Sequence, residues 1–166
     1  MAPPPSPPLE QAKSVLTEYR EYVKDIPEDL TIWVVMRKAP PLPFLPEEVY
    51  GKEVVVMAAC YVGALEDGQK LFDPIRKFGT PHGEHVGVQP FTAWQAAFDP
   101  LLTPGARNYW ESHNFKELSD GFFDALIEFT GKLPSPHNEV FIGPQGGRLG
   151  FRWRRRLTLS VTRNSP

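Results

Sequence analysis

The sequence predicts an α+β fold, with helices packed on one face of an antiparallel β-sheet. Five runs are rich in β-branched and aromatic residues, as strands are, and amphipathic helical segments are interleaved with them irregularly. A parallel sheet would need a regular alternation of strand and helix. At 166 residues and 41% hydrophobic content, the chain is long enough to bury one core without disulfides or metal.

Four helices are predicted, over 9–25, 64–78, 92–98 and 120–130. Ser6 caps the first, Pro7 takes its first position, and Pro27 stops it. Its apolar stripe has spacings of three and four residues: Ala12, Leu16, Tyr19, Val23 and Ile26. The side chains expected to point inward from the other two long helices are Leu65, Leu71, Phe72, Ile75, Phe122, Phe123, Leu126, Ile127 and Phe129.

Strands are predicted over 30–37, 53–61, 85–89, 107–115 and 139–142. The apolar run within 53–61 is unbroken, which implies that both faces of this strand are largely covered. Cys60, the single cysteine, lies in that run with no histidine near it in sequence. We therefore expect a small buried hydrophobe and not a reactive nucleophile.

The charge distribution divides the chain. All 20 acidic residues precede Gly146, whereas six arginines follow it, which leaves a net charge of -8 before that glycine and +6 after it. We expect a proline-rich, solvated leader over 1–8, one domain over 9–147, and a basic tail over 148–166 that packs poorly on the body.

Several function classes are excluded by the absence of their signatures. The sequence has no dinucleotide-binding or phosphate-binding glycine motif, no G-x-S-x-G elbow and no paired cysteines. It has neither an apolar stretch long enough to span a membrane nor a signal peptide at its start. A cytoplasmic location without membrane contact is the default expectation.

Two segments carry candidate chemistry. His82, Glu84 and His85 could place two imidazoles on a metal, but they lie in a Gly/Pro-rich loop without an evident third ligand, which favours a solvated loop. In 107–113, alternation puts Arg107, Tyr109, Glu111 and His113 on one face and Asn108, Trp110 and Ser112 on the other. Such a strand can stack on a planar ligand; the alternative is a core Trp110 with a solvent-facing remainder.

Five segments occur in the order seen in bacterial FAD-linked oxidases of the berberine-bridge type, and the match spans about residues 9–147. They are Leu42-Pro43-Phe44-Leu45-Pro46, Cys60-Tyr61-Val62-Gly63, Leu71 to Gly79, Arg107 to Ser112, and Phe141 to Gly147. The chain resembles the substrate-binding domain of this family. A collinear series of this kind is more specific than any one motif.

The resemblance implies that the antiparallel sheet forms the roof of a substrate pocket above the isoalloxazine ring. The strand with Tyr109 and Trp110 would line that pocket, and Gln145 falls where the family often has a polar pocket residue. In intact members FAD takes a hydride from an alcohol, sugar or amine carbon. With the strand pattern, this makes Arg107, Tyr109, Trp110, His113 and Gln145 the candidate substrate-binding residues, with Tyr109 and His113 facing the flavin.

The chain departs from the family in lacking a counterpart of the flavin domain and of the family's last segment. We therefore expect no tightly bound FAD, weak binding of a small-molecule substrate, and no activity of the chain alone. The arginine-rich end also differs from the family and is consistent with a change of reading frame. A separately encoded flavin domain or a second copy of the chain would cover an exposed sheet. The alternative function is a module that binds a polyanion or a protein through its arginine tail, although the acidic body disfavours nucleic acid.

Overall fold

The computed structural model describes residues 8–101, 105, 107–145 and 156–165. Their backbone forms a five-stranded antiparallel sheet in the order β2-β1-β4-β5-β3. The strands are β1 (Leu30–Lys38), β2 (Glu53–Tyr61), β3 (Arg107–Phe115), β4 (Glu139–Gln145) and β5 (Arg156–Ser165). The helices are α1 (Ala12–Tyr22), α2 (Leu65–Ile75), α3 (Phe91–Ala96) and α4 (Asp120–Thr130), with short 3-10 turns at Leu9–Gln11, Glu47–Val49 and Asp99–Leu101.

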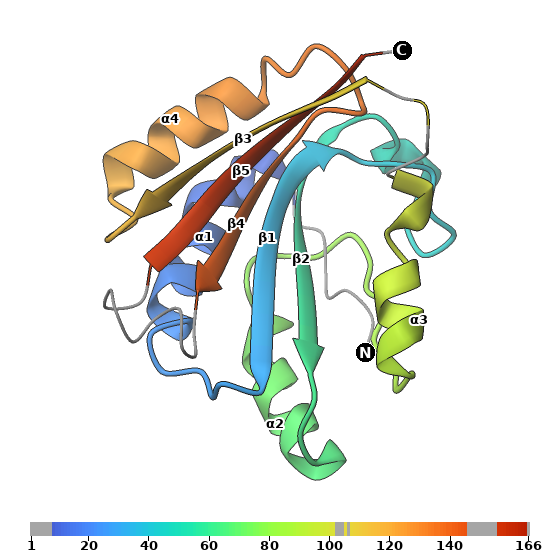
Figure 1. Ribbon diagram of the computed structural model, residues 1–166, viewed down its shortest axis with the longest axis vertical. Helices are drawn as coiled ribbons and strands as arrows, with labels where there is room; N and C mark the ends of the chain where they lie inside the picture. Colours follow the sequence, from blue (N-terminus) through green and yellow to red (C-terminus); the bar gives the residue numbers. More distant parts are fainter. Residues whose placement is uncertain (1–7, 102–104, 106, 146–155, 166) are drawn as a thin grey trace.

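Helices α1, α2 and α4 pack on one face of the sheet, which confirms the predicted α+β class. Figure 1 looks onto the opposite face, with α1 and α2 behind the strands. Alternate residues of β1, β2 and β4 point into the helical layer and are buried there with residues of all three helices. This core includes Leu16, Tyr19, Ile32, Val34, Met36, Val55, Met57, Phe72, Ile75, Phe123, Leu126, Val140 and Ile142.

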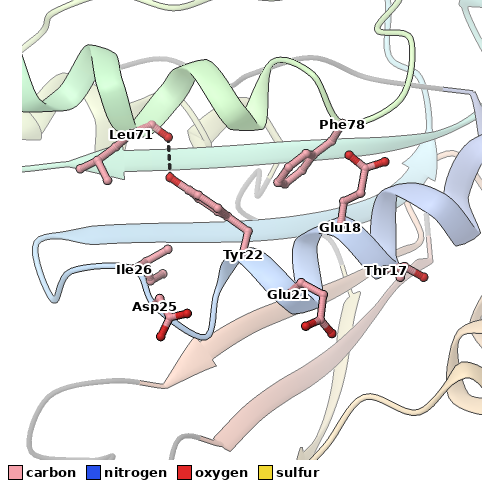
Figure 2. Close-up of a pocket in the computed structure, with 8 residues that line it drawn as sticks. All are labelled: Thr17, Glu18, Glu21, Tyr22, Asp25, Ile26, Leu71 and Phe78. Carbon is pink, nitrogen blue, oxygen red and sulfur yellow. Dashed lines mark hydrogen bonds between the residues drawn. The ribbon is translucent and has the colours of Figure 1, made fainter.

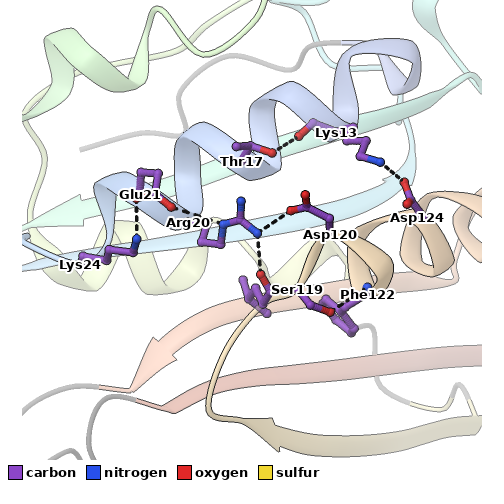
Figure 3. A network of polar contacts seen from close by, with 10 residues as sticks. Lys13, Thr17, Arg20, Glu21, Lys24, Ser119, Asp120, Phe122 and Asp124 are labelled. Atoms are coloured by element: carbon purple, nitrogen blue, oxygen red, sulfur yellow. Dashed lines mark hydrogen bonds and ion pairs between the residues drawn. The ribbon is translucent and has the colours of Figure 1, made fainter.

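A network of polar contacts holds α1 against α4 (Figure 3). The guanidinium of Arg20 pairs with Asp120 at 2.7 Å, donates a hydrogen bond to the Leu118 carbonyl at 2.8 Å, and lies over the ring of Phe123. One turn further along α4, Asp124 pairs with Lys13 of α1 at 2.6 Å. Ser119 caps α4, because its hydroxyl accepts a hydrogen bond from the Phe122 amide.

The other face of the sheet is covered in part by the loop between β1 and β2. Leu45 and Val49 of that loop pack with Ala39 and Val54 in a second, smaller apolar cluster. The helix α3 borders the same face, since Phe98, just beyond its end, contacts Trp33 of β1 with ring centroids 5.9 Å apart. The prediction that both faces of 53–61 are covered is therefore confirmed over most of β2.

Three local predictions are wrong. Residues 85–89 form no strand: they pair with none of the described strands, and Val88 is 75% exposed. Leu65 is 59% exposed at the first turn of α2, and Phe129 is 63% exposed near the end of α4, where its ring faces the Lys132 ammonium group and not the core.

The apolar stripe predicted for the first helix is buried throughout, although α1 ends at Tyr22. Its predicted cap, Ser6 with Pro7, lies outside the described residues.

The expectation that the basic tail packs poorly is wrong for 156–165, whereas 148–155 and Pro166 lie outside the described residues. Residues 156–165 form β5, which lies between β4 and β3 and pairs with both, from Glu139↔Thr162 to Gln145↔Arg156 on one side and from Arg107↔Ser165 to Phe115↔Leu157 on the other. The end of the chain thus joins β3 to the rest of the sheet. No helix among the described residues is long and apolar enough to cross a membrane.

Candidate functional site

An aromatic strip crosses the face of the sheet that α1, α2 and α4 leave open. It consists of Trp33 of β1, Phe141 of β4 and Trp110 of β3. Phe141 pairs with Val35, two residues from Trp33, while Trp110 stacks on the Phe141 ring with an interplanar angle of 14° and centroids 6.1 Å apart. Trp33 is 37% exposed and Trp110 49%. Large aromatic surfaces are costly to leave in water, so this strip is the main candidate for contact with a ligand or partner.

Gly143 makes room for the strip. A Cβ atom at this position would lie 3.0 Å from Cδ1 of Trp33, which is tighter than an ordinary van der Waals contact. The indole of Trp33 therefore lies against the β4 backbone where any other residue would push it away. Because Gly143 has no side chain, nothing projects from this position between Trp33 and Phe141.

The face assignment within β3 is corrected by the structure. Alternation does separate Tyr109 and His113 from Trp110, as predicted. However, His113 contacts the ring of Phe115, which in turn packs on Phe122 of α4, so their face is the one turned toward the helices. Both Tyr109 and His113 remain exposed, because β3 is an edge strand. Trp110 is thus the residue of this strand that faces the open side.

The remaining two candidates are located by their backbone alone. Arg107 begins β3 and Gln145 ends β4, and their β5 partners, Ser165 and Arg156, lie at opposite ends of that strand. The side chains of Arg107 and Gln145 lie outside the described residues. Whether any of the five candidates binds substrate stays a prediction.

A buried ion pair lies beside the strip and was not anticipated from the sequence. Arg37 of β1 and Glu139 of β4 are direct cross-strand partners, joined at 2.7 Å and almost fully buried. Burial raises the pKa of Glu139, and the charge of Arg37 opposes that rise. Both charges lie at strand ends, with Arg37 next to Lys38 and Glu139 first in β4, so the sequence pattern alone does not distinguish them from exposed charges. The pair anchors β4 to β1 at one end of the open face.

The other two sequence features, the loop with His82 and His85 and the single cysteine, make structural contacts in the described part of the chain. Glu84 pairs with Arg76 at 3.3 Å, and the ring of His85 stacks on Phe44. Within the described residues, no group of three or more His, Cys, Asp or Glu side chains could hold a metal ion. Cys60 is half-buried, and this burial raises the pKa of its thiol, which disfavours the reactive thiolate.

Comparisons with known proteins give the fold a context. A curated FAD-linked oxidoreductase from Dictyostelium discoideum is 23% identical over 141 residues, which are 83% of this chain and 28% of that protein. The solved 6-hydroxy-D-nicotine oxidase from Arthrobacter nicotinovorans superposes on 99% of this chain with a TM-score of 0.70 at 14% identity. Berberine bridge enzyme from Eschscholzia californica superposes on 96% with a TM-score of 0.65 at 16% identity.

This chain has the fold of one part of the berberine-bridge-type FAD-linked oxidases. The resemblance inferred from the sequence segments is thereby confirmed. No protein-family model matches the chain. The chain spans 38% of the solved nicotine oxidase and 34% of the solved berberine bridge enzyme, so it corresponds to about a third of such proteins.

The described residues fit one part of FAD and not the whole cofactor. The aromatic strip can face a planar ring system such as isoalloxazine. A pyrophosphate is commonly bound by a glycine-rich turn that opens a helix, and none of the described helices follows such a turn; the residues before them are Gln11, Ala64, Pro90 and Ser119. No step of flavin chemistry therefore follows from the described part of the chain.

Proposed function

We propose that this chain supplies the substrate-facing layer of an FAD-linked oxidase that acts on an alcohol, a sugar or an amine. The observation that carries this proposal is the aromatic strip on the open face of the sheet. The fold likeness to FAD-linked oxidases supports it. In the proposed arrangement the strip would form one wall of the substrate site, and FAD, when bound by the complete protein, would supply hydride-transfer chemistry opposite that wall.

The shape and the chemistry of the open face suit this role. The strip is built on three strands of one sheet, so its rings are held by backbone pairing and not by a mobile loop. Rigid aromatic side chains provide a large contact area with little loss of conformational entropy when a ligand binds. The indole N–H groups of Trp33 and Trp110 can in addition donate hydrogen bonds to a polar substrate.

Among the five candidate residues, Trp110 has the strongest case. It faces the open side and is half exposed, and its ring is parallel to that of Phe141. Gln145 ends the strand that carries Phe141, so we retain it as a candidate at the border of the strip. Tyr109 and His113 belong to the set of β3 residues directed toward the helices and would act only at the rim of a pocket. Arg107 is placed only by its backbone, at the start of the same strand.

The proposal predicts that FAD binds the chain weakly and that planar ligands bind through Trp110. Lumiflavin, which is the flavin ring system without ribityl phosphate or adenosine, is a suitable probe. We expect Trp110→Ala to weaken its binding about 2-fold to 10-fold, since an aromatic stacking contact contributes about 0.5–1.5 kcal/mol. The fluorescence anisotropy of lumiflavin, titrated with the protein, measures this change.

Phe129→Ala is the matched control, because it removes an aromatic ring that is also exposed but lies on α4, on the other side of the sheet. It should leave lumiflavin binding unchanged. Circular dichroism shows whether each variant keeps its fold. Equal affinity of the wild-type chain and Trp110→Ala, or a loss confined to Phe129→Ala, would contradict the proposal.

A further inference from the structure

The helical layer contains an open cavity on the side of the sheet opposite the aromatic strip. It lies between α1 and α2 and has a volume of about 550 Å³, within the range of roughly 300–1,000 Å³ of small-molecule sites. Figure 2 shows its lining residues: Thr17, Glu18, Glu21, Tyr22, Asp25, Ile26, Leu71 and Phe78. From the chemistry of these residues we infer a second binding site, specific for an aromatic ammonium ion.

The floor of the cavity is aromatic and rigid. The hydroxyl of Tyr22 donates a hydrogen bond to the Leu71 carbonyl of α2 at 2.7 Å, which fixes the phenol across the gap between the helices (Figure 2). Its ring meets Phe78 edge to face, with centroids 5.7 Å apart and an interplanar angle of 77°. Ile26 and Leu71 complete the apolar surface. An apolar ring can therefore be buried here without disturbing a polar contact.

The rim of the cavity is acidic. Glu18, Glu21 and Asp25 line it, and the lining includes no lysine or arginine. The charge of Glu21 is compensated, since its carboxylate pairs with Lys24 and Arg20, and the hydrogen bond from Lys24 contributes most to lowering its pKa. Glu18 and Asp25 form no ion pair with any of the described residues. Two carboxylates that have no ion-pair partner in the described part of the chain thus lie beside an aromatic floor.

An aromatic floor with an acidic rim favours a ligand that has both a positive charge and an aromatic ring. A cation is attracted both by a carboxylate and by the electron-rich face of an aromatic ring. An ammonium group at Glu18, whose side chain reaches toward Phe78 in Figure 2, would leave the attached aromatic body over Tyr22 and Phe78. A neutral compound of the same shape would lose the charge interaction, and an anion would be repelled.

Three probes of nearly the same size separate these contributions: phenethylamine as the cation, 2-phenylethanol as the neutral compound and 3-phenylpropionate as the anion. Titrations of the ¹⁵N-labelled chain, followed by amide chemical shifts, report both affinity and location. We expect phenethylamine to shift amides of 17–26 and 71–78 with saturation. 2-Phenylethanol should bind at least about 5-fold more weakly, and 3-phenylpropionate should not saturate. Raising the salt concentration should weaken only the binding of the amine.

The double variant Glu18→Gln/Asp25→Asn should weaken phenethylamine binding by about 5-fold to 10-fold and leave 2-phenylethanol binding unchanged. Glu48→Gln/Glu117→Gln removes two exposed charges elsewhere and serves as the control that should bind as the wild-type chain does. Equal affinities for the amine and the alcohol would overturn the inference. So would amine-induced shifts confined to the aromatic strip, or an undiminished affinity in the double variant. The outcome is independent of the function proposed for the open face.

Discussion

Truncation of the chain after Gly147 is expected to destroy the cooperative fold. Strand β5 lies between β4 and β3, so its removal leaves β3 with no hydrogen-bonded neighbour in the described sheet and opens the edge of β4. Domains of this size are stabilised by only about 5–15 kcal/mol. We expect a loss of at least about 5 kcal/mol, visible as a lost or strongly shifted urea transition.

A single substitution tests the same point without shortening the chain. The backbone of Ser160 lies between Phe141 of β4 and Ser112 of β3. Because β5 has a partner on each side, Ser160→Pro removes a backbone donor of the sheet and should cost about 3 kcal/mol or more. Ser160→Ala keeps the N–H group and should have a small effect. A chain truncated after Gly147 that unfolds at the wild-type urea concentration would show that β5 contributes nothing to stability.

The second large effect is expected at the buried ion pair. Arg37→Met removes the partner of Glu139 and leaves its carboxylate buried and uncompensated. Loss of one member of such a pair typically costs about 3–5 kcal/mol, whereas replacing both is often nearly neutral. At pH 8 we therefore expect Arg37→Met to be strongly destabilised and Arg37→Met/Glu139→Gln to recover most of the loss, as measured by urea unfolding.

The pH dependence of this loss has a definite sign. Burial already raises the pKa of Glu139 in the folded chain, and the opposing charge of Arg37 is absent in Arg37→Met. A carboxyl whose pKa is raised by folding stabilises the fold below its unfolded pKa, and this contribution is lost as the pH rises through the folded pKa. The difference in the free energy of unfolding between Arg37→Met and the double variant should thus become smaller as the pH falls. A difference that becomes larger toward acidic pH would contradict this account.

Much of the fold follows from local patterns in the sequence. The stripe from Ala12 to Ile26 is buried as its helical spacing predicts, and the bounds of β2 and β3 agree with the β-branched and aromatic runs. By contrast, β5 lies in the segment predicted to be a basic tail, because the neighbouring arginines obscure a clear strand pattern. Leu157, Leu159 and Val161 alternate with threonine and serine, which is the pattern of a strand with one covered face.

The candidate site was predicted less well, and the reason is geometric. Alternation divides the residues of β3 into two sets but does not say which set faces the helices. Phe115 belongs to the set of Tyr109 and His113, and its apolar ring was the available clue that this set points inward. The strip itself joins strands that are far apart in sequence, so the neighbourhood of Trp33, Phe141 and Trp110 depends on the strand order.

The most direct test of the proposed open-face function is to record the indole N–H resonances of the ¹⁵N-labelled chain during a lumiflavin titration, with single Trp→Phe variants for assignment. If the aromatic strip faces the flavin and the substrate, the resonances of Trp33 and Trp110 should shift together and most strongly. Trp94, which belongs to α3 and is only 5% exposed, should shift least of these three. Shifts that spare Trp33 and Trp110, or that are confined to amides of α1, α2 and α4, would contradict the account.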